Sequence, residues 1–264
     1  MQPKQAISAA LRSAKADGQP AIVAYMTAGF PTAAQFPELL RLLAASADVV
    51  EIGVPFTDPM ADGATIQRSS RIGLQQGATL KWIFAQLEKL STPVPAPLLL
   101  MSYLNPLLAF GFERLAAAAV RTGVSGFIVP DLPFEESAPL RAALSPHGLA
   151  LVQLVTPVTP DDRLAMLCKA SEGFVYAVTM TGTTGKSVAV PEQVLTYLDR
   201  VRKVSTLPVC AGFGIRNHEQ VQRLAAHVDG VVVGSALVEV LERKEDPGEF
   251  LRGLQALKAG VGVD

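Results

Sequence analysis

Apolar residues along this chain follow two alternating patterns. Short runs rich in β-branched side chains are typical of buried strands, and segments with apolar positions three or four residues apart are typical of helices. We predict strands over residues 21–27, 48–54, 98–103, 126–130, 149–155, 174–179, 208–211 and 230–233. We predict helices over residues 7–16, 33–45, 80–90, 112–121, 135–144, 161–169, 192–204, 218–226 and 248–258.

Strands that alternate with helices in this way imply a parallel sheet covered by helices. The chain has 264 residues, so eight strand–helix units average about 33 residues each, which suits the roughly 250 residues of a (β/α)₈ barrel. We therefore expect the α/β class and a (β/α)₈ TIM barrel with an extra N-terminal helix. An open doubly wound sheet with an added lobe is the alternative. No linker rich in Gly, Ser or Pro divides the chain, so we expect one domain over residues 1–264.

The composition narrows the classes of function. The 23 basic and 24 acidic residues give a net charge of −1, which provides no basic excess to bind nucleic acid or an anionic membrane. No apolar run approaches the roughly 20 residues of a membrane span, and the first residues lack the apolar core of a signal peptide. Cys168 and Cys210 show no metal-ligand spacing. We expect a cytoplasmic protein.

A carboxylate interrupts the apolar strand predicted at residues 48–54. Glu51 lies among β-branched residues of this strand, and Asp62 lies in the loop that follows. A charged side chain in a buried strand is costly unless it has a partner, a metal or a proton that it keeps at neutral pH. Two explanations stay open: an ion pair with a basic residue, or a general acid/base with a raised pKa opposite Asp62. Because such barrels place their chemistry at the C-terminal ends of strands, Glu51 is expected at the barrel mouth.

Three glycine-containing segments follow the last three predicted strands, at residues 181–185, 211–215 and 234–235. Glycines let backbone N–H groups approach an anion, and a helix N-terminus adds favourable partial charge. The alternative is that they only end strands and turn corners, but three in this order favour a phosphate site. The predicted donors are in Gly185, Phe213, Gly214, Gly234 and Ser235.

The sequence Gly185-Lys186-Ser187 is similar to the end of a nucleotide P-loop, but Met180 occupies the position of the required first glycine. We expect residues 182–190 instead to form a loop that closes over the substrate.

Six segments resemble the tryptophan synthase alpha subunit family over nearly the whole chain. They are Tyr-Met-Thr-Ala-Gly at 25–29, Glu-Ile-Gly-Val-Pro-Phe-Thr-Asp-Pro-Met-Ala-Asp-Gly at 51–63, Met-Ser-Tyr-Leu-Asn-Pro at 101–106, Val-Pro-Asp-Leu-Pro at 129–133, Gly-Thr-Thr-Gly at 182–185 and Gly-Phe-Gly-Ile at 212–215. The segment at 51–63 is the most specific, because few other barrels pair two carboxylates in that frame. Many phosphate-binding barrels share the later glycine loops.

The resemblance implies retro-aldol cleavage of indole-3-glycerol phosphate to indole and glyceraldehyde 3-phosphate, with no metal or organic cofactor. Glu51 would deliver a proton, and Asp62 would accept the indole N–H as positive charge develops. Tyr176 would lie beside Glu51. The apolar walls for the indole would come from Tyr25, Met101 and Ile128. Thr184 would link to Asp58 when the loops close. Tyr and Met at strand ends are also common plain core residues.

The resemblance also implies an αββα heterotetramer in which indole passes to a pyridoxal phosphate enzyme, the β subunit. Residues 55–62 and 182–190 would face that partner. Met180 lies where some family members carry a basic residue, and Phe30 replaces a more usual polar residue before Pro31. Neither change affects Glu51 or Asp62.

Three other functions stay open. An autonomous lyase that releases free indole would use the same catalytic residues. A sugar-phosphate epimerase or isomerase commonly needs a metal or a different acid/base set, and the chain has only 3 His residues. A non-catalytic activating subunit would have no reason to keep a buried carboxylate such as Glu51.

Overall fold

The computed structural model describes residues 1–16, 18–179, 190–212 and 214–255. Eight parallel strands close into a barrel in chain order, because β8 pairs with β1. The TIM-barrel prediction is therefore confirmed. The strands are β1 (Ala21–Thr27), β2 (Val49–Gly53), β3 (Leu98–Met101), β4 (Val124–Ile128), β5 (Ala150–Val155), β6 (Val175–Val178), β7 (Val209–Gly212) and β8 (Gly230–Val233).

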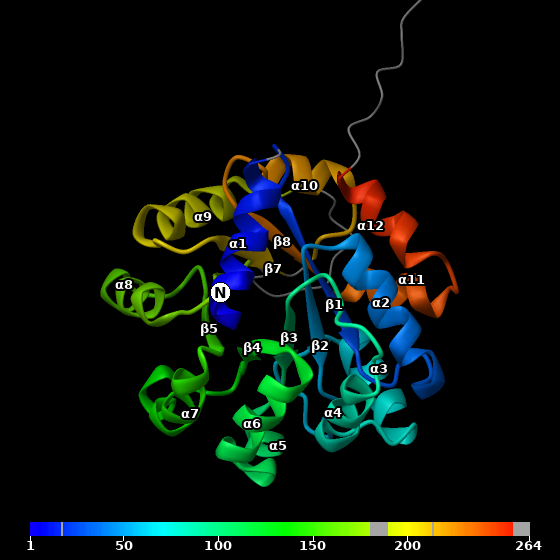
Figure 1. Cartoon of the computed structure of the whole chain (residues 1–264). Coiled ribbons are helices and arrows are strands. Elements are labelled where there is room, and N and C mark those ends of the chain that lie inside the picture. The colour runs from blue at the N-terminus through cyan, green and yellow to red at the C-terminus, as the bar shows by residue number, and fades with distance from the viewer. Residues whose placement is uncertain (17, 180–189, 213, 256–264) are drawn as a thin grey trace, which may run out of the picture.

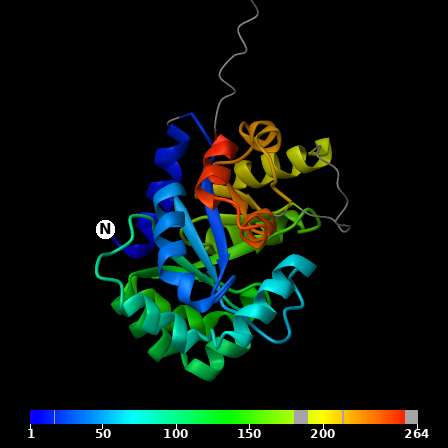
Figure 2. The ribbon, with the colours of Figure 1, turned by 90° about the vertical axis from the view of Figure 1, so that its right-hand side faces the viewer.

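Helices surround the barrel, as Figure 1 shows from one end and Figure 2 from the side. The α-helices are α1 (Pro3–Ala16), α2 (Phe36–Ser46), α3 (Ala64–Gln75), α4 (Leu80–Glu88), α5 (Leu104–Phe110), α6 (Phe112–Thr122), α7 (Ala138–Leu144), α8 (Asp161–Ala170), α9 (Glu192–Val204), α10 (His218–Leu224), α11 (Ser235–Glu242) and α12 (Pro247–Gln255). Short 3₁₀ helices are η1 (Ala33–Gln35), η2 (Phe134–Glu136) and η3 (Ser145–His147). None of the helices in these ranges is long and apolar enough to cross a membrane.

The barrel has two apolar layers, because successive side chains of a strand point to opposite faces. The inner layer includes Val23, Val49 and Val152, and Ile7 and Leu11 of α1 pack against it. The N-terminal helix predicted from the sequence is therefore α1, which lies across the barrel in Figure 1. Ile7 and Leu11 of α1 therefore cover one end of the inner layer of the barrel.

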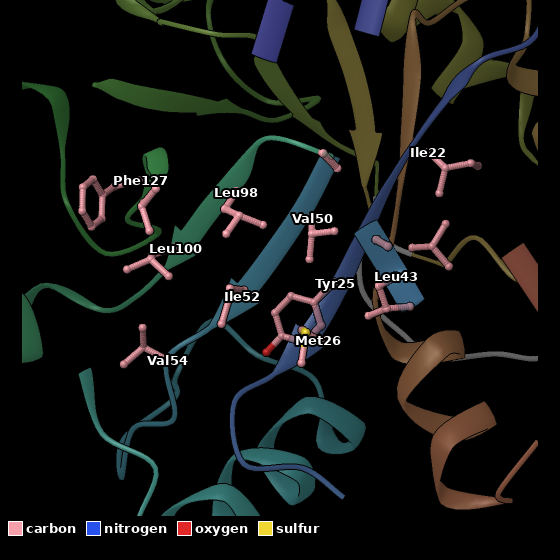
Figure 3. Packing of buried hydrophobic residues seen from close by; sticks show 14 of the residues in the cluster. Ile22, Tyr25, Met26, Leu43, Val50, Ile52, Val54, Leu98, Leu100 and Phe127 are labelled. Carbon is pink, nitrogen blue, oxygen red and sulfur yellow. The ribbon is translucent and has the colours of Figure 1, made fainter. Parts of the chain in front are cut away.

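The outer layer lies between the strands and the surrounding helices. Figure 3 shows part of it, with Val50 and Ile52 of β2 beside Leu98 and Leu100 of β3. Both faces of each strand are thus buried, which explains why the strands appear in the sequence as continuous apolar runs. Within such a strand, a carboxylate such as Glu51 stands out.

The sequence prediction missed three helices. The segment that became α3 was predicted as part of a long loop, because its inward face carries Ser69, Ser70 and Gly73 rather than large apolar residues. The starts of α5 and α11 were predicted only as loops after strands. Both helices are short, with seven and eight residues, so they offer few turns of periodicity.

Two predicted helices are divided by proline. The predicted helix at 33–45 is split into η1 and α2 around Pro37, and the one at 135–144 is split into η2 and α7 around Pro139. Proline has no N–H to donate to the carbonyl four residues earlier, so a continuous α-helix cannot pass through it. The end of the predicted helix at 248–258 lies outside the described residues.

Candidate active site

Glu51 lies in the middle of β2, between Tyr25 of β1 and Leu99 of β3 in the sheet register. It shares the strand face of Val49, so its side chain belongs to the barrel interior. The residue is 1% exposed, and its Oε2 atom is buried without a hydrogen-bond partner among the described residues. Burial, and then the negative charge of Asp62, raises the pKa of Glu51 to about 8. At neutral pH the carboxyl group therefore holds a proton that it can donate.

Asp62 lies in the loop between β2 and α3 and is partly exposed. The Asp62 backbone N–H donates to the Pro59 carbonyl at 3.0 Å. The Gln67 side-chain amide donates to the Asp62 backbone carbonyl at 2.9 Å. Burial raises the pKa of the Asp62 carboxyl to about 6, although a hydrogen bond with the Tyr103 hydroxyl lowers it. Asp62 is therefore mostly ionised at neutral pH, while Glu51 is mostly protonated.

Tyr103 holds the Asp62 loop from the barrel side. Its hydroxyl oxygen accepts a hydrogen bond from the Ala61 N–H at 2.9 Å, and its ring stacks on Phe56 with centroids 5.4 Å apart. Tyr103 is 4% exposed. Tyr103 thus contacts Phe56, the Ala61 backbone and the Asp62 carboxyl group.

Tyr25 and Tyr176 each lie across a glycine at the end of the next strand. A Cβ atom on Gly53 would lie 2.1 Å from the Tyr25 hydroxyl, and one on Gly212 would lie 2.2 Å from that of Tyr176. Both distances are far below contact distance, so only glycine leaves room for each ring. Burial is the main cause that raises both phenol pKa values, and the Glu51 charge adds to it, which places both rings within the field of that carboxylate.

A chain of hydroxyl groups connects Tyr25 to α3. Thr27 Oγ1 lies 3.2 Å from the Tyr25 hydroxyl and 2.7 Å from Ser69 Oγ, and Ser69 Oγ donates to the Ile66 carbonyl at 2.9 Å. Thr27 and Ser69 are fully buried. The small polar residues that concealed α3 in the sequence therefore bind it to the interior of the barrel.

The predicted apolar walls lie at two strand ends. Met101 is the last residue of β3 and Ile128 the last of β4, and they pair in the sheet. A cavity of about 530 Å³ reaches Met101 and Tyr176 as well as Ala61, the residue before Asp62. Ile128 is fully buried within the inner layer and is not part of the lining of this cavity. The cavity thus joins three of the segments that carry predicted site residues.

The described part of the predicted phosphate site is close to Tyr25. Gly234 precedes α11, and Ser235 is the first residue of that helix, whose first N–H groups have no partner within the helix. A Cβ atom on Gly234 would lie 3.8 Å from the Tyr25 Cβ atom, so this helix start adjoins the interior. Gly214 has φ +87°, a conformation that favours glycine. Thr184, Gly185 and Phe213, like Met180, lie outside the described residues.

Within the described ranges, no three His, Cys, Asp or Glu side chains gather in a way that could hold a metal ion.

Comparison with known proteins identifies the family. A family model described as tryptophan synthase alpha chain matches residues 11–260. The chain belongs to the tryptophan synthase alpha chain family. The tryptophan synthase alpha chain of Desulfovibrio desulfuricans is 46% identical over 244 residues, which cover 91% of this chain and 96% of that protein. The corresponding chain of Bacillus cereus is 43% identical over 236 residues, covering 89% and 92%.

Solved structures agree with this assignment. Tryptophan synthase from M. tuberculosis superposes with a TM-score of 0.83 at 31% identity, covering 95% of this chain and 99% of that chain. Tryptophan synthase subunit alpha from Legionella pneumophila gives a TM-score of 0.84 at 31% identity, covering 96% and 97%. The alpha-chain role in tryptophan biosynthesis follows from family membership, and alpha chains are lyases that cleave indole-3-glycerol phosphate.

Sequence reasoning did not single out Tyr103 in this alpha chain. The signal was available, because Tyr103 lies in the family-like segment 101–106, directly after β3. Its hydrogen bonds to the Asp62 loop cross from one strand end to the next, and such contacts cannot be deduced from spacing along the chain.

Asp131, which the sequence placed after the fourth strand, accepts a hydrogen bond from the Leu104 N–H at 2.9 Å and so caps α5.

Replacing Glu51 with glutamine is expected to stabilise the alpha chain above pH 5. The folded-state pKa of about 8 exceeds the usual value of 4.5, so the folded state retains a proton that the unfolded chain releases. Wild-type stability is therefore fully present below pH 4.5 and falls as pH rises to about 8. At pH 7.5 we expect an advantage of about 1–3 kcal/mol for the variant, because a buried amide without partners offsets part of the gain.

Urea unfolding of both proteins at pH 4.5, 6 and 7.5 measures this effect. Glu38→Gln on the exposed surface of α2 provides the matched control for the same chemical change. A Glu51→Gln advantage that is absent at every pH would contradict the raised pKa.

Proposed function

We propose that this alpha chain cleaves indole-3-glycerol phosphate to indole and glyceraldehyde 3-phosphate, with Glu51 as the general acid and Asp62 as its ionised partner. The observation that carries the proposal is the buried Glu51 carboxyl group, which has an oxygen without a partner and a pKa of about 8. A proton held in this way is available for transfer at neutral pH. Asp62, with a pKa of about 6, keeps its negative charge under the same conditions.

The proposed reaction has two proton transfers. Glu51 gives its proton to C3 of the indole ring, and the positive charge that develops on the ring is stabilised by Asp62, which accepts the ring N–H. The bond from C3 to the glycerol carbon then breaks. The hydroxyl on that carbon becomes the aldehyde carbonyl, and its proton returns to the Glu51 carboxylate. The proton count of Glu51 is therefore unchanged after one turnover.

We assign the phosphate group to the start of α11. The N–H groups at Ser235 and Gly234, the Ser235 hydroxyl and the left-handed turn at Gly214 support an anion there. Gly185 and Phe213 stay sequence predictions for further donors, and Thr184 stays a prediction for loop closure. A Cβ atom on Gly234 would lie 3.8 Å from the Tyr25 Cβ atom, so a phosphate held there would lie close to Tyr25.

We assign the indole ring to the apolar part of the cavity. Tyr176 and Met101 line it, Tyr25 would close the side nearest the phosphate, and Ile128 would support it from below. Both tyrosine hydroxyl groups are protonated at neutral pH, as an ordinary phenol is, and burial raises their pKa values further. They therefore add no charge that would compete with Asp62 for the developing cation.

The cleavage rate is expected to depend on pH through both carboxyl groups. Glu51 must be protonated, so kcat/KM should fall as pH rises through about 8. Asp62 must be ionised, so kcat/KM should also fall as pH drops through about 6. Steady-state assays from pH 5 to 9 should give a bell-shaped profile, whose two apparent pKa values belong to the interacting pair.

Tyr103→Phe tests the origin of the acidic limb. This variant removes a hydrogen bond that lowers the Asp62 pKa, so the acidic limb should move to higher pH while the basic limb keeps its position. A flat profile in the wild-type protein, or a shift of the basic limb only, would contradict the assignment.

Alpha chains of this family belong to the tryptophan synthase complex with a beta partner. We propose an αββα heterotetramer in the cytoplasm, in which indole passes to a pyridoxal phosphate β subunit. The loop before Asp62 is the proposed contact, because Asp58 is exposed there and Met60 is 84% exposed. An exposed methionine two residues before Asp62 is suited to burial by another protein.

Indole release from indole-3-glycerol phosphate, measured with and without a β subunit, tests the proposed function. Slow release that rises sharply with the partner would support both the chemistry and the subunit role. Fast release by the chain alone would favour the autonomous lyase, and no release in either condition would contradict the proposal.

A further inference from the structure

The end of β5 extends beyond the end of β4 in the closed barrel. These strands pair only from Gly126–Ala150 to Ile128–Val152. The second strand continues to Val155 and pairs there with β6, whereas the chain after Ile128 leaves the sheet toward η2. Residues 153–155 therefore have no strand partner on their β4 side. We call the gap between residues 129–133 and residues 153–156 the β4–β5 window.

The cavity that Met101 and Tyr176 line extends through this window. Leu154 and Tyr176 line its inner part and belong to the inner layer, whereas Leu151 and Leu167 line its outer part and belong to the outer layer. Because Leu151 and Leu154 point to opposite faces of β5, a cavity that contacts both must pass around the free strand edge. The interior of the barrel is thus connected to a crevice between β5 and α8.

Gln153 lies in the window and lines this cavity. It is 7% exposed, and its backbone N–H donates to Ser171 Oγ at 2.9 Å. Its side-chain amide forms no hydrogen bond with any residue in the described ranges. The neighbouring lining residues Leu151, Leu167 and Phe134 are apolar, and Thr156, Thr159 and Arg163 add polar groups toward the rim. The amide atoms of Gln153 are not among the fully buried unpaired side-chain atoms of the described residues, so they are accessible from the cavity, where water or a bound molecule can hydrogen-bond to them.

The outer rim of the window is held in place. Arg163 of α8 donates two hydrogen bonds to Glu135 of η2, at 2.5 and 3.1 Å. Arg141 of α7 lies over the Phe134 ring, 5.5 Å from its centroid. Arg163 and Glu135 are both exposed, so the rim is at the protein surface. The positive charge of Arg163 is already paired, which makes the window a poor site for a phosphate.

We propose that the β4–β5 window is a product subsite that binds indole after cleavage. Indole is flat and apolar and has one N–H group, which would donate to Gln153 Oε1 while the ring packs between the leucines of the crevice. The inference rests on the proposed function, because indole is the product of that reaction. It adds a site that takes no part in bond breaking. Indole would move past Tyr176 to the window and leave the phosphate product at the start of α11.

Crystals soaked in 5-bromoindole locate the ligand through the anomalous signal of bromine. We expect one peak beside Glu51 and a second beside Gln153. A peak beside Glu51 alone would overturn the window subsite and leave the proposed cleavage intact. No peak at either position would overturn the window subsite and would also count against the indole pocket of the proposed function.

Calorimetry in solution tests the role of the amide. The chain is first saturated with indole-3-propyl phosphate, which lacks the hydroxyl needed for bond breaking and fills the catalytic part of the cavity. Wild type should then bind added indole about three- to ten-fold more tightly than indene, which has the same shape but no N–H. Gln153→Met should remove this preference, because methionine retains the volume and loses the amide.

Gln86→Met provides the matched control, since Gln86 lies on α4 away from the window. It should bind indole and indene as the wild type does. Equal affinities for indole in wild type and Gln153→Met, with both proteins folded by circular dichroism, would overturn the assignment of Gln153. Absence of indole binding to the saturated wild-type chain would overturn the subsite itself.

Discussion

Glu51→Gln is expected to reduce the rate of indole formation from indole-3-glycerol phosphate by about 10²–10⁴-fold, the usual contribution of a positioned general acid/base. Glutamine has almost the same shape as a protonated glutamate, but it cannot give a proton to C3 or take one from the glycerol hydroxyl. The side chain is 1% exposed, so bulk water has little access to replace it. The loss should therefore appear in kcat rather than in substrate affinity.

The measurement is a steady-state assay of kcat and KM, with substrate binding measured separately by calorimetry. Glu38→Gln serves as the matched control, because it makes the same chemical change on the exposed surface of α2. Near-normal turnover by Glu51→Gln, or a loss of equal size in Glu38→Gln, would show that Glu51 is not the acid.

Asp62→Asn should lower kcat by about 10²-fold and change KM by less than about threefold, since removing one group that stabilises transition-state charge has effects of this size. The substrate is neutral at the indole ring, and positive charge develops only as C3 gains its proton. The Asp62 carboxylate therefore interacts most strongly in the transition state, which is the condition for an effect on kcat.

The same variant should alter the pH profile. Without the Asp62 charge, one cause of the raised Glu51 pKa is removed, so the basic limb of the profile should move to lower pH. Asp162→Asn at the exposed start of α8 is the control for charge removal alone. A main effect on KM, or an unchanged kcat, would contradict the role given to Asp62.

The fold was largely predictable because every strand is buried on both faces. Continuous apolar runs such as 21–27 and 230–233 gave strands with the observed bounds. The errors concern segments whose burial depends on small or polar residues. The inward face of α3 uses Ser69, whose hydroxyl is satisfied by Thr27 on β1, and no local pattern indicates such a partner.

The candidate site could be predicted where a residue conflicts with its surroundings. Glu51 was identifiable because a carboxylate in an apolar strand requires an explanation. Asp62 was identifiable because it is a second carboxylate in the loop that follows this strand. Tyr103 and Gln153 were not identifiable in this way. A tyrosine or glutamine near a strand end is unremarkable in a sequence, and only the folded barrel brings Tyr103 to the Asp62 loop and places Gln153 in the lining of the cavity.

The most direct test of the central claim is the product yield from indole-3-glycerol phosphate with the purified wild-type chain and with Glu51→Gln, assayed side by side. Indole and glyceraldehyde 3-phosphate are both quantified. We expect the wild type to form the two products in equal amounts and the folded variant to form both about 10²–10⁴-fold more slowly. Indole formation by Glu51→Gln at the wild-type rate, or no products from the wild type, would contradict it.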